Sequence, residues 1–256
     1  NSIYPKVDYG SITPINGSST TNTSVELNFS IIEDDLDEIK FNWNGTNYSV
    51  YDNSIVLMMN FDNISSIGDN DSTSTDLSQY NNHGDLLGNA GYNISGKYGS
   101  GLQLDGEDDY MNLSHTSSLN ITGAITISLW ERTADIDVTA TWGMSIFGRG
   151  FYGDPRNTMD LRVRATGDTA VFGYEYGSGA NSDYAIGTTD ITDGNWHHIV
   201  AQWNGTDCLV YVDGSYENST SCPNAPGPFD QGFVLGKSLN SSLENQVDFN
   251  GSIDEL

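Results

Sequence analysis

The sequence predicts an all-β protein built from antiparallel sheets. Between Trp196 and Trp203 the side chains alternate as they do in a half-buried strand. One face would carry Ile199, Ala201 and Trp203, and the other His198, Val200 and Gln202. A second apolar run, 207–212, follows, and the dipeptides Asn204-Gly205 and Asp213-Gly214 end the two runs. Such dipeptides favour the tight turns of β-hairpins, so this stretch predicts a three-stranded antiparallel meander.

Five segments in one order extend this prediction to most of the chain. Together they resemble the concanavalin A-like jelly-roll modules of the laminin G-like group, and this resemblance implies an antiparallel jelly-roll sandwich over residues 54–256. The segments are 82–84 (NHG), 96–113 (GKYGSGLQLDGEDDYMNL), 125–130 (ITISLW), 196–214 (WHHIVAQWNGT followed by LVYVDG) and 249–256 (FNGSIDEL). The fold by itself does not give the function.

Further strands are expected along the jelly-roll region. The apolar run 55–61, IVLMMNF, predicts the first buried strand, and 62–82 reads as a long polar loop. The segment 253–256 reads as the start of a closing strand, so we expect the chain to continue beyond it. The remaining expected strands are 102–104, 110–113, 125–130, 144–147, 161–164, 171–174 and 233–235.

The region before residue 54 differs in pattern. Residues 1–10 have no clear period and are expected to form a linker or an exchanged strand, whereas 11–53 predict three short strands. So few residues cannot bury a good core alone, so this piece is expected to dock on the jelly roll or to borrow strands from a neighbour. We interpret 11–53 as a small immunoglobulin-like or fibronectin-like unit. Its coupling to a jelly roll resembles cell-surface proteins of archaea.

The charge balance limits the partners. The chain has 35 acidic and 9 basic residues and a formal net charge of −26. This charge argues against nucleic acid or an anionic membrane as partner and favours cations or neutral sugars. It is also what keeps a crowded extracellular or high-salt protein in solution. No apolar run approaches the roughly 20 residues needed to cross a bilayer, so direct membrane insertion of this segment is not expected.

Two features indicate an exported protein. Cys208 and Cys222 are the only cysteines and flank the Asp213-Gly214 turn, which favours a disulfide over two buried thiols. Asn-x-Ser/Thr sequons are dense and predict a secreted, N-glycosylated protein at the cell surface. The sequon asparagines are Asn16, Asn22, Asn28, Asn44, Asn47, Asn63, Asn70, Asn93, Asn112, Asn120, Asn204, Asn218, Asn240 and Asn250.

Acidic turns suggest one structural Ca²⁺, which the resemblance also implies, because carboxylate oxygens are the ligands this ion prefers. The expected ligands are Asp62, Asp105, Asp108, Asp109 and Asp254. An exposed acidic hairpin explains the 105–109 turn equally well. The segment Asp69-x-Asp71-x-Thr73 has the spacing of a calcium loop but lacks the glycine and the distal glutamate of that loop.

No catalytic constellation emerges from the sequence, and no catalytic cofactor is expected. A jelly-roll glycosidase needs two carboxylates about 5 Å apart on one strand face, whereas the acidic run 33–38 reads as a solvated turn outside the jelly roll. His197 and His198 should point to opposite faces of a strand and so cannot chelate one metal. A set of arginines among aromatics is expected either to stack on sugars or to pair with acidic neighbours: Arg149, Phe151, Tyr152, Arg156, Arg162, Arg164, Tyr174, Tyr176 and Tyr184.

These observations favour a non-catalytic, extracellular glycoprotein module. Its expected role is cell-surface adhesion or the building of a surface layer or filament, with other copies or other surface proteins as partners. A carbohydrate-binding module of a secreted protein is the alternative, in which glycans are the ligands. The sequence does not identify the glycan.

Overall fold

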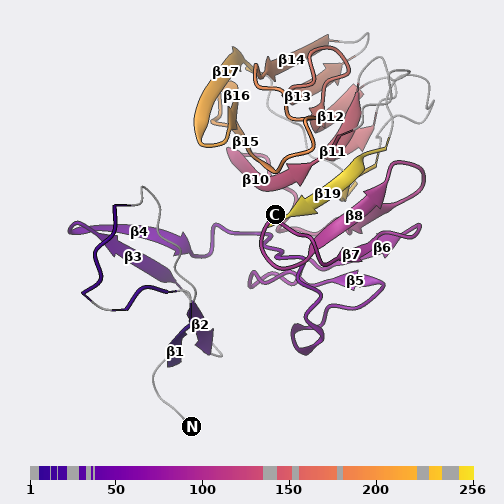
Figure 1. Cartoon of the computed structure of the whole chain (residues 1–256). Helices are drawn as coiled ribbons and strands as arrows, with labels where there is room; N and C mark the ends of the chain where they lie inside the picture. The colour runs from indigo at the N-terminus through magenta and orange to yellow at the C-terminus, as the bar shows by residue number, and fades with distance from the viewer. Residues whose placement is uncertain are drawn as a thin grey trace. The chain divides into compact units, whose positions relative to one another are not determined.

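The computed structural model divides the chain into two compact units, 1–55 and 56–256, which we describe separately (Figure 1). Both consist mainly of β-strands. The structure describes residues 6–11, 13–15, 17–21, 29–32, 36, 38–134, 143–151, 156–177, 181–223, 231–237 and 248–256. No helix among these residues is long and apolar enough to cross a membrane.

The first unit contains two short antiparallel pairs. The strands are β1 (Lys6–Tyr9) with β2 (Phe29–Ile32), and β3 (Ile39–Trp43) with β4 (Thr46–Tyr51). Asn44 and Gly45 connect β3 to β4 with φ angles of 49° and 81°, which is the positive-φ geometry that a tight hairpin turn needs. The Glu38 carboxylate contacts Lys40 and accepts a hydrogen bond from Ser49. The immunoglobulin-like character of this unit stays a prediction, since 22–28, 33–35 and 37 lie outside the described residues.

The second unit is a sandwich of two antiparallel sheets, as the sequence predicts. In the described part of the chain, one sheet has seven strands in the order β17-β16-β15-β10-β19-β8-β7. Their bounds are β7 (Gly91–Asn93), β8 (Gly101–Asp105), β10 (Ile125–Arg132), β15 (His197–Trp203), β16 (Asp207–Val212), β17 (Ser215–Ser221) and β19 (Asn250–Asp254).

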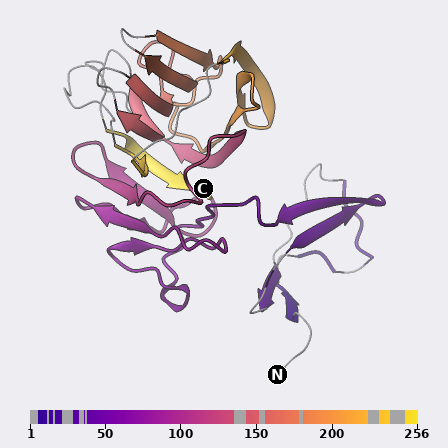
Figure 2. The same cartoon turned by 180° about the vertical axis from the view of Figure 1, so that it is seen from behind.

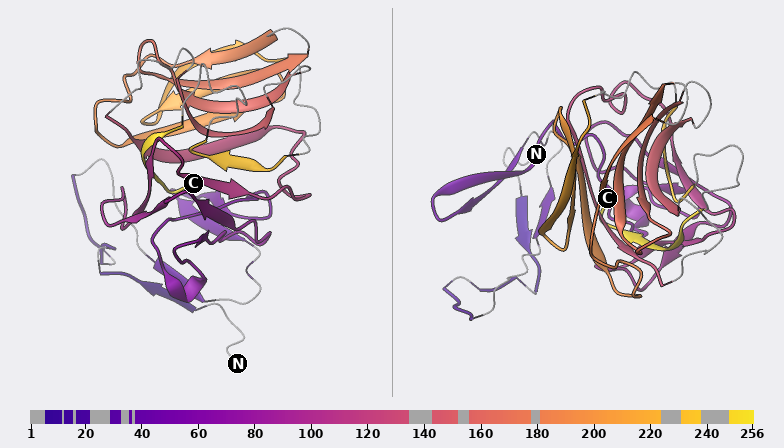
Figure 3. Two further views of the ribbon diagram at one scale, coloured as in Figure 1. Left: turned by 90° about the vertical axis from the view of Figure 1, so that its right-hand side faces the viewer. Right: turned by 90° about the horizontal axis from the view of Figure 1, so that it is seen from above.

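The facing sheet has eight strands in the order β14-β13-β12-β11-β18-β9-β6-β5 over the residues described. The two layers face each other in the view from above (Figure 3). The strands are β5 (Thr73–Ser74), β6 (Gly84–Leu87), β9 (Tyr110–Leu113), β11 (Met144–Phe151), β12 (Arg156–Val163), β13 (Ala170–Gly177), β14 (Asn181–Ile186) and β18 (Phe233–Leu235). A single 3₁₀ turn, η1 (Ser65–Ile67), lies in the loop before β5.

The last strand of the chain lies inside the first sheet rather than at its edge. Strand β19 pairs with β10 on one side and with β8 on the other, and it is yellow in Figures 1 and 2. It joins strands that lie more than a hundred residues earlier in the sequence. The sheet therefore becomes continuous only when the C-terminal segment is in place.

Alternating side chains build the core between the sheets. On β15, Ile199, Ala201 and Trp203 are buried, and the side chains between them are half-buried on the opposite face. Seven residues of β10 pair with β15, from Ile125 opposite Trp203 to Glu131 opposite His197, so the same alternation continues across the sheet. The predicted assignment of these faces is confirmed. Other fully buried side chains of the core are Phe61, Leu102, Leu104, Met111, Leu129, Leu161, Phe172 and Ile253.

The prediction of a first strand at 55–61 is wrong, and burial is confirmed for Met59 and Phe61 alone. This segment forms no strand, yet Met59 and Phe61 are buried in the core. Met59 exchanges two backbone hydrogen bonds with Leu256, and Met58 accepts one from Leu77. The positive φ of Phe61, 52°, then turns the chain out of an extended path. A short apolar run predicts that a segment is buried, but it does not by itself predict that the segment pairs with other strands.

The predicted disulfide is present and closes the end of the sandwich. Cys208 on β16 is joined to Cys222, just after β17, with the two Cα atoms 5.6 Å apart. Both residues are buried in the core, and the Cys222 carbonyl accepts a hydrogen bond from the Trp203 indole at 3.1 Å. The cross-link therefore holds β17 against the core.

Candidate functional site

The outward face of the eight-stranded sheet carries a buried polar network. Asp160 on β12 accepts hydrogen bonds from Ser145 on β11 at 2.8 Å and from Arg162 at 3.3 Å. Arg162 also donates to the Tyr184 hydroxyl at 3.1 Å, and that hydroxyl donates to Glu175 at 2.9 Å. Four neighbouring strands thus contribute one member or more to a single chain of hydrogen bonds.

The geometry of this network follows from strand register. Asp160 and Arg162 are two residues apart on β12, so both point to the same face of the sheet. Gly173 lies opposite Asp160 and beside Tyr184, and its missing side chain leaves space for the tyrosine ring. A Cβ on Gly173 would lie 2.7 Å from a ring carbon of Tyr184. Burial raises the pKa of Tyr184, and the charges of Glu175 and Asp160 add to this effect against the opposing Arg162.

The arginine and aromatic residues grouped in the sequence are separated in the structure. Arg162 pairs with acidic neighbours and stacks on Tyr184, with its guanidinium carbon 4.2 Å from the ring centroid. Arg149 and Tyr174 point into the core instead, and Arg164 is exposed beyond β12. The side chains of Phe151 and Arg156, and residue Tyr152, lie outside the described part of the structure. These residues therefore form no single sugar-stacking surface among the described side chains.

The buried Arg149 has a structural role. Its guanidinium donates to the carbonyl oxygens of Leu119 and Ile121, and it stacks on Phe233 with 4.6 Å between guanidinium carbon and ring centroid. Burial lowers its pKa to about 10, so it remains charged at neutral pH. It ties the segment between β9 and β10 to the core.

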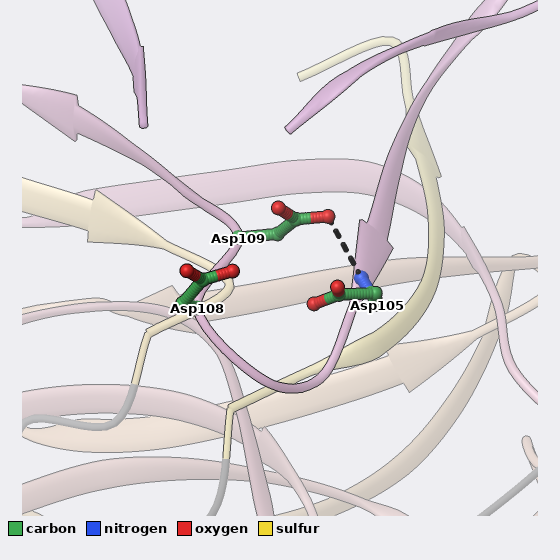
Figure 4. A group of neighbouring side chains, drawn as sticks. All are labelled: Asp105, Asp108 and Asp109. Carbon is green, nitrogen blue, oxygen red and sulfur yellow. Dashed lines mark hydrogen bonds between the residues drawn. The ribbon is translucent and has the colours of Figure 1, made fainter. Parts of the chain in front are cut away.

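The five predicted calcium ligands fall into two groups. The first comprises Asp105, Asp108 and Asp109 in the turn after β8 (Figure 4), with one carboxylate oxygen of each within 4.8 Å of the others. Asp109 is buried and accepts hydrogen bonds from the backbone N–H groups of Asn89 and Asp105. Two ligands of one Ca²⁺ lie up to about 5 Å apart, so this spacing fits the ion.

The second group comprises Asp62 and Asp254, with Glu255 beside them. Asp62 accepts the backbone N–H of Ser100 at 3.0 Å, and Asp254 accepts that of Tyr98 at 2.9 Å. Burial raises the pKa of Asp254 to about 6, and burial with the charges of Asp254 and Asp62 raises that of Glu255 to about 7. A cation would relieve this repulsion, although no three ligand atoms of the described residues here lie within 4.8 Å.

The two acidic groups lie toward opposite ends of strand β8. Asp105 ends β8 opposite Asn250, whereas Asp254 follows Ile253, which lies opposite Leu102. A strand rises about 3.3 Å per residue, so one ion cannot contact both groups. The sequence identified the acidic residues but not their division, because that division depends on the register of β19 against β8.

A third set of ionisable groups lies at the end of the β10–β15 pair. His197 is buried, and its two ring nitrogens lie 2.9 Å from Asp213 and 3.2 Å from Asp193. Burial alone would lower the pKa of His197, but the hydrogen bonds and charges of the two aspartates outweigh it and raise the pKa above the usual value. His198 points outward, so the two histidines do separate as predicted.

Glu131 is the least expected member of this set. It lies opposite His197 in the register and is fully buried, and neither carboxyl oxygen has a hydrogen-bond partner among the described residues. Burial raises its pKa well above the usual range, and the charges of Asp193 and Asp213 add to the shift. Sequence reasoning overlooked it, although Glu131 continues the inward alternation of Ile127 and Leu129.

Comparison with known proteins places this geometry in a family. Residues 105–256 match a laminin G-like model described as the concanavalin A-like lectin/glucanases superfamily. The chain belongs to this superfamily. This confirms the resemblance and the fold class inferred from the sequence. A search of curated protein sequences found no match.

Two solved structures share the fold. The binding domain of Paraclostridial Mosquitocidal Protein 1 matches with a TM-score of 0.58 and 14% identity, over 78% of this chain and 47% of that one. Domain 4 of an extracellular arabinanase from Geobacillus stearothermophilus, solved with arabinotriose, matches with a TM-score of 0.57 and 20% identity. That match covers 78% of this chain and 89% of the domain. This chain thus spans about half of the toxin domain, and these identities establish a likeness of fold alone.

The set of ionisable groups around Glu131 and His197 gives a prediction about the pH dependence of stability. The folded-state pKa values of Glu131 and His197 are both raised, so the stability they contribute is present at low pH and is lost as pH rises. Replacing Glu131 with glutamine keeps a neutral side chain at every pH. We therefore expect E131Q to unfold like the native protein near pH 4 and to be more stable at pH 8, by on the order of 1 kcal/mol or more.

Urea unfolding at several pH values measures this effect. The matched control is E107Q, which removes an exposed carboxylate outside this set, so a change in the pH profile that is specific to E131Q is assigned to Glu131. If E131Q loses stability at pH 8 relative to the native protein, Glu131 is ionised in the fold and its assigned protonation is incorrect.

Proposed function

We propose that the chain is a non-catalytic binding module of an extracellular glycoprotein, acting in cell-surface adhesion or in building a surface layer or filament. The observation that supports this most is how the buried carboxylates of the sandwich are used. Asp160 and Glu175 are buried in hydrogen bonds to Ser145, Arg162 and Tyr184, and Glu131 is closed off from solvent. These three carboxylates thus serve the structure, and the outer surface is left for binding.

Export is supported by the disulfide and by the sequons. A buried Cys208–Cys222 bridge suits an oxidising compartment. Seven sequon asparagines are exposed: Asn44, Asn47, Asn63, Asn70, Asn204, Asn218 and Asn250. Asn93, Asn112 and Asn120 are half-buried, and Asn16, Asn22, Asn28 and Asn240 lie outside the described residues.

We expect glycans at the exposed sequons and lower occupancy at the half-buried ones. Asn204 is the best candidate, because its turn is exposed and its side-chain oxygen, not its amide nitrogen, is the atom that accepts hydrogen bonds from Thr206. Asn93 is the contrasting case, since its amide nitrogen donates to Gln103. Glycopeptide mass spectrometry of native material measures both sites. Glycan-free peptides at all exposed sequons would refute the glycoprotein assignment.

Calcium binding is part of the proposal, at one of the two acidic groups. The 105–109 turn would offer three carboxylates, and the other group would offer Asp62 and Asp254. An ion bound only to the folded state raises the melting temperature as its concentration increases. We expect D108N or D254N to abolish that rise, whichever belongs to the occupied group, while D168N, at a half-buried turn residue that belongs to neither group, does not. A melting curve that chelator and added Ca²⁺ leave unchanged would exclude both sites.

Partners of two kinds are proposed. Apolar side chains of the first unit, Phe41, Tyr48 and Val50, are exposed and suit contacts with other copies or other surface proteins. Glycans are the alternative partners, favoured by the arabinanase domain that was solved with arabinotriose. If glycans are the partners, soluble sugars should compete with attachment of the protein. If other protein copies or surface proteins are the partners, they should not.

Adhesion is tested with beads that carry the full chain. We expect these beads to cluster together or to attach to cell-surface material of the source organism, whereas beads with the reduced, unfolded chain do neither. Competition by soluble glycans would favour the carbohydrate-binding alternative. Release of reducing ends from a panel of polysaccharides would contradict the non-catalytic assignment.

A further inference from the structure

Two cations lie on tryptophan rings on the outward face of the seven-stranded sheet. The Lys97 ammonium lies 4.0 Å from the ring centroid of Trp130, and the Arg132 guanidinium carbon lies 4.9 Å from that of Trp196. Trp130 and Arg132 are two residues apart on β10 and therefore share one face. Cation–π attraction of this kind holds a charged group in place without neutralising it.

Neither cation forms an ion pair with any described carboxylate. This is unexpected in a chain with 35 acidic and 9 basic residues. Other cations of the chain do pair: Arg162 with Asp160, Lys237 with Asp248 and Lys40 with Glu38. Asp254 lies opposite Trp130 in the register, but it is fully buried and accepts the backbone N–H of Tyr98. The positive charges of Lys97 and Arg132 are therefore not balanced by a direct carboxylate contact.

Neutral hydrogen-bonding side chains continue the same face beyond the cations. Arg132 donates to the Ser252 hydroxyl at 3.4 Å, and Ser252 donates to the Gln103 amide oxygen at 2.9 Å. Asn93 donates to the same oxygen at 2.7 Å. These residues come from β10, β19, β8 and β7, which are consecutive in the sheet. Amide and hydroxyl groups in such a row suit the hydroxyls of a sugar.

Aromatic side chains border the cations on the other side. His198 on β15 lies 5.0 Å from Trp130 between ring centroids, and Tyr98 packs edge-on against Trp130 at 6.2 Å. Tyr98 is 47% exposed and so offers a ring to a ligand. We call Lys97, Tyr98, Trp130, Arg132 and Trp196, with Ser252, Gln103 and Asn93, the cation–indole face.

We propose that the cation–indole face binds an acidic saccharide, with Lys97 and Arg132 contacting its carboxylate or sulfate groups. This inference rests on the proposed binding function and specifies its ligand class. The exposed Gln103 and the half-buried Asn93 would contact sugar hydroxyls, and the buried Ser252 would orient Gln103. Tyr98 would contact the apolar side of a ring. Hydrogen bonds between charged groups are about twice as strong as neutral ones, so the anion supplies the discrimination.

The net charge of the protein favours a saccharide over a second copy of the chain. Two copies would bring together formal charges of −26 each. Repulsion from the whole protein is screened beyond about 8 Å at physiological ionic strength, so one sugar acid can still contact two local cations. An acidic peptide would also satisfy the cations, so poly-glutamate serves as the competing probe.

Binding to the full chain is measured through tryptophan fluorescence, because Trp130 and Trp196 form part of the face. The probes are an oligogalacturonate, a sulfated dextran oligosaccharide, the unsulfated dextran and poly-glutamate. We expect at least one acidic saccharide to bind, and the unsulfated dextran to bind about tenfold more weakly or not at all. The two acidic probes distinguish a preference for carboxylate from one for sulfate.

Charge-removing variants test the site. K97Q/R132Q should weaken saccharide binding by about tenfold or more, whereas R164Q removes an exposed charge elsewhere and should change it less than about twofold. Unchanged melting temperatures confirm that the variants fold. Equal binding of neutral and acidic dextrans, no loss in K97Q/R132Q, tighter binding of poly-glutamate, or no binding of either acidic saccharide would each overturn the inference.

The bead assay separates this inference from the proposed function. Attachment that K97Q/R132Q leaves unchanged would retain the adhesion function and reject the cation–indole face as its site. Failure of the native chain to attach at all, together with failure to bind the saccharides, would reject both.

Discussion

The sandwich depends on the two-residue period of its strands. Each strand turns one set of side chains to the core and the next set to the outside, and register carries this division across a sheet. In the β10–β15 pair, Leu129 and Ile199 fall opposite each other and are both fully buried. A slip of one residue would bring Trp130 and His198 into the core and expose Leu129 and Ile199. Every site described above inherits its position from this alternation.

Both outer faces result from the same rule but differ in chemistry. On the eight-stranded sheet, Asp160 and Arg162 are buried together, so their charges stabilise each other and have little access to a ligand. On the seven-stranded sheet, Lys97 and Arg132 lie on indoles and keep their charge for a partner. Pairing or lack of pairing therefore separates structural cations from candidate binding cations. Residue type and sequence position alone do not make that distinction.

Glu131 shows where alternation works against stability. It occupies an inward position that a leucine would fill without an electrostatic penalty, and within the described part of the chain its carboxyl group has no hydrogen-bond partner. A buried, unpaired carboxyl group disfavours ionisation, so its cost appears mainly as a dependence on pH. His197 on the neighbouring strand also makes stability fall as pH rises, because its two aspartate partners favour the protonated ring.

The sequence by itself determined the fold class, the hairpin from β15 to β16 and the faces of their strands. Alternation and Asn-Gly or Asp-Gly turns act over a few residues, so a local pattern suffices for them. The cysteine pair and the acidic turn residues can also be identified from the sequence, because residue type and spacing are enough to find them. The segment 55–61 shows the limit of such patterns. Its apolar side chains predicted burial, but they did not show that the segment forms no strand.

Only the tertiary structure decided which distant residues meet. It inserted β19 between β10 and β8, and this register placed Asp254 away from Asp105. It also turned Arg149 into the core and Arg162 outward, and it set Lys97 over Trp130. These outcomes depend on contacts between strands that are far apart in the chain, and no local pattern of side chains records which of those strands become neighbours.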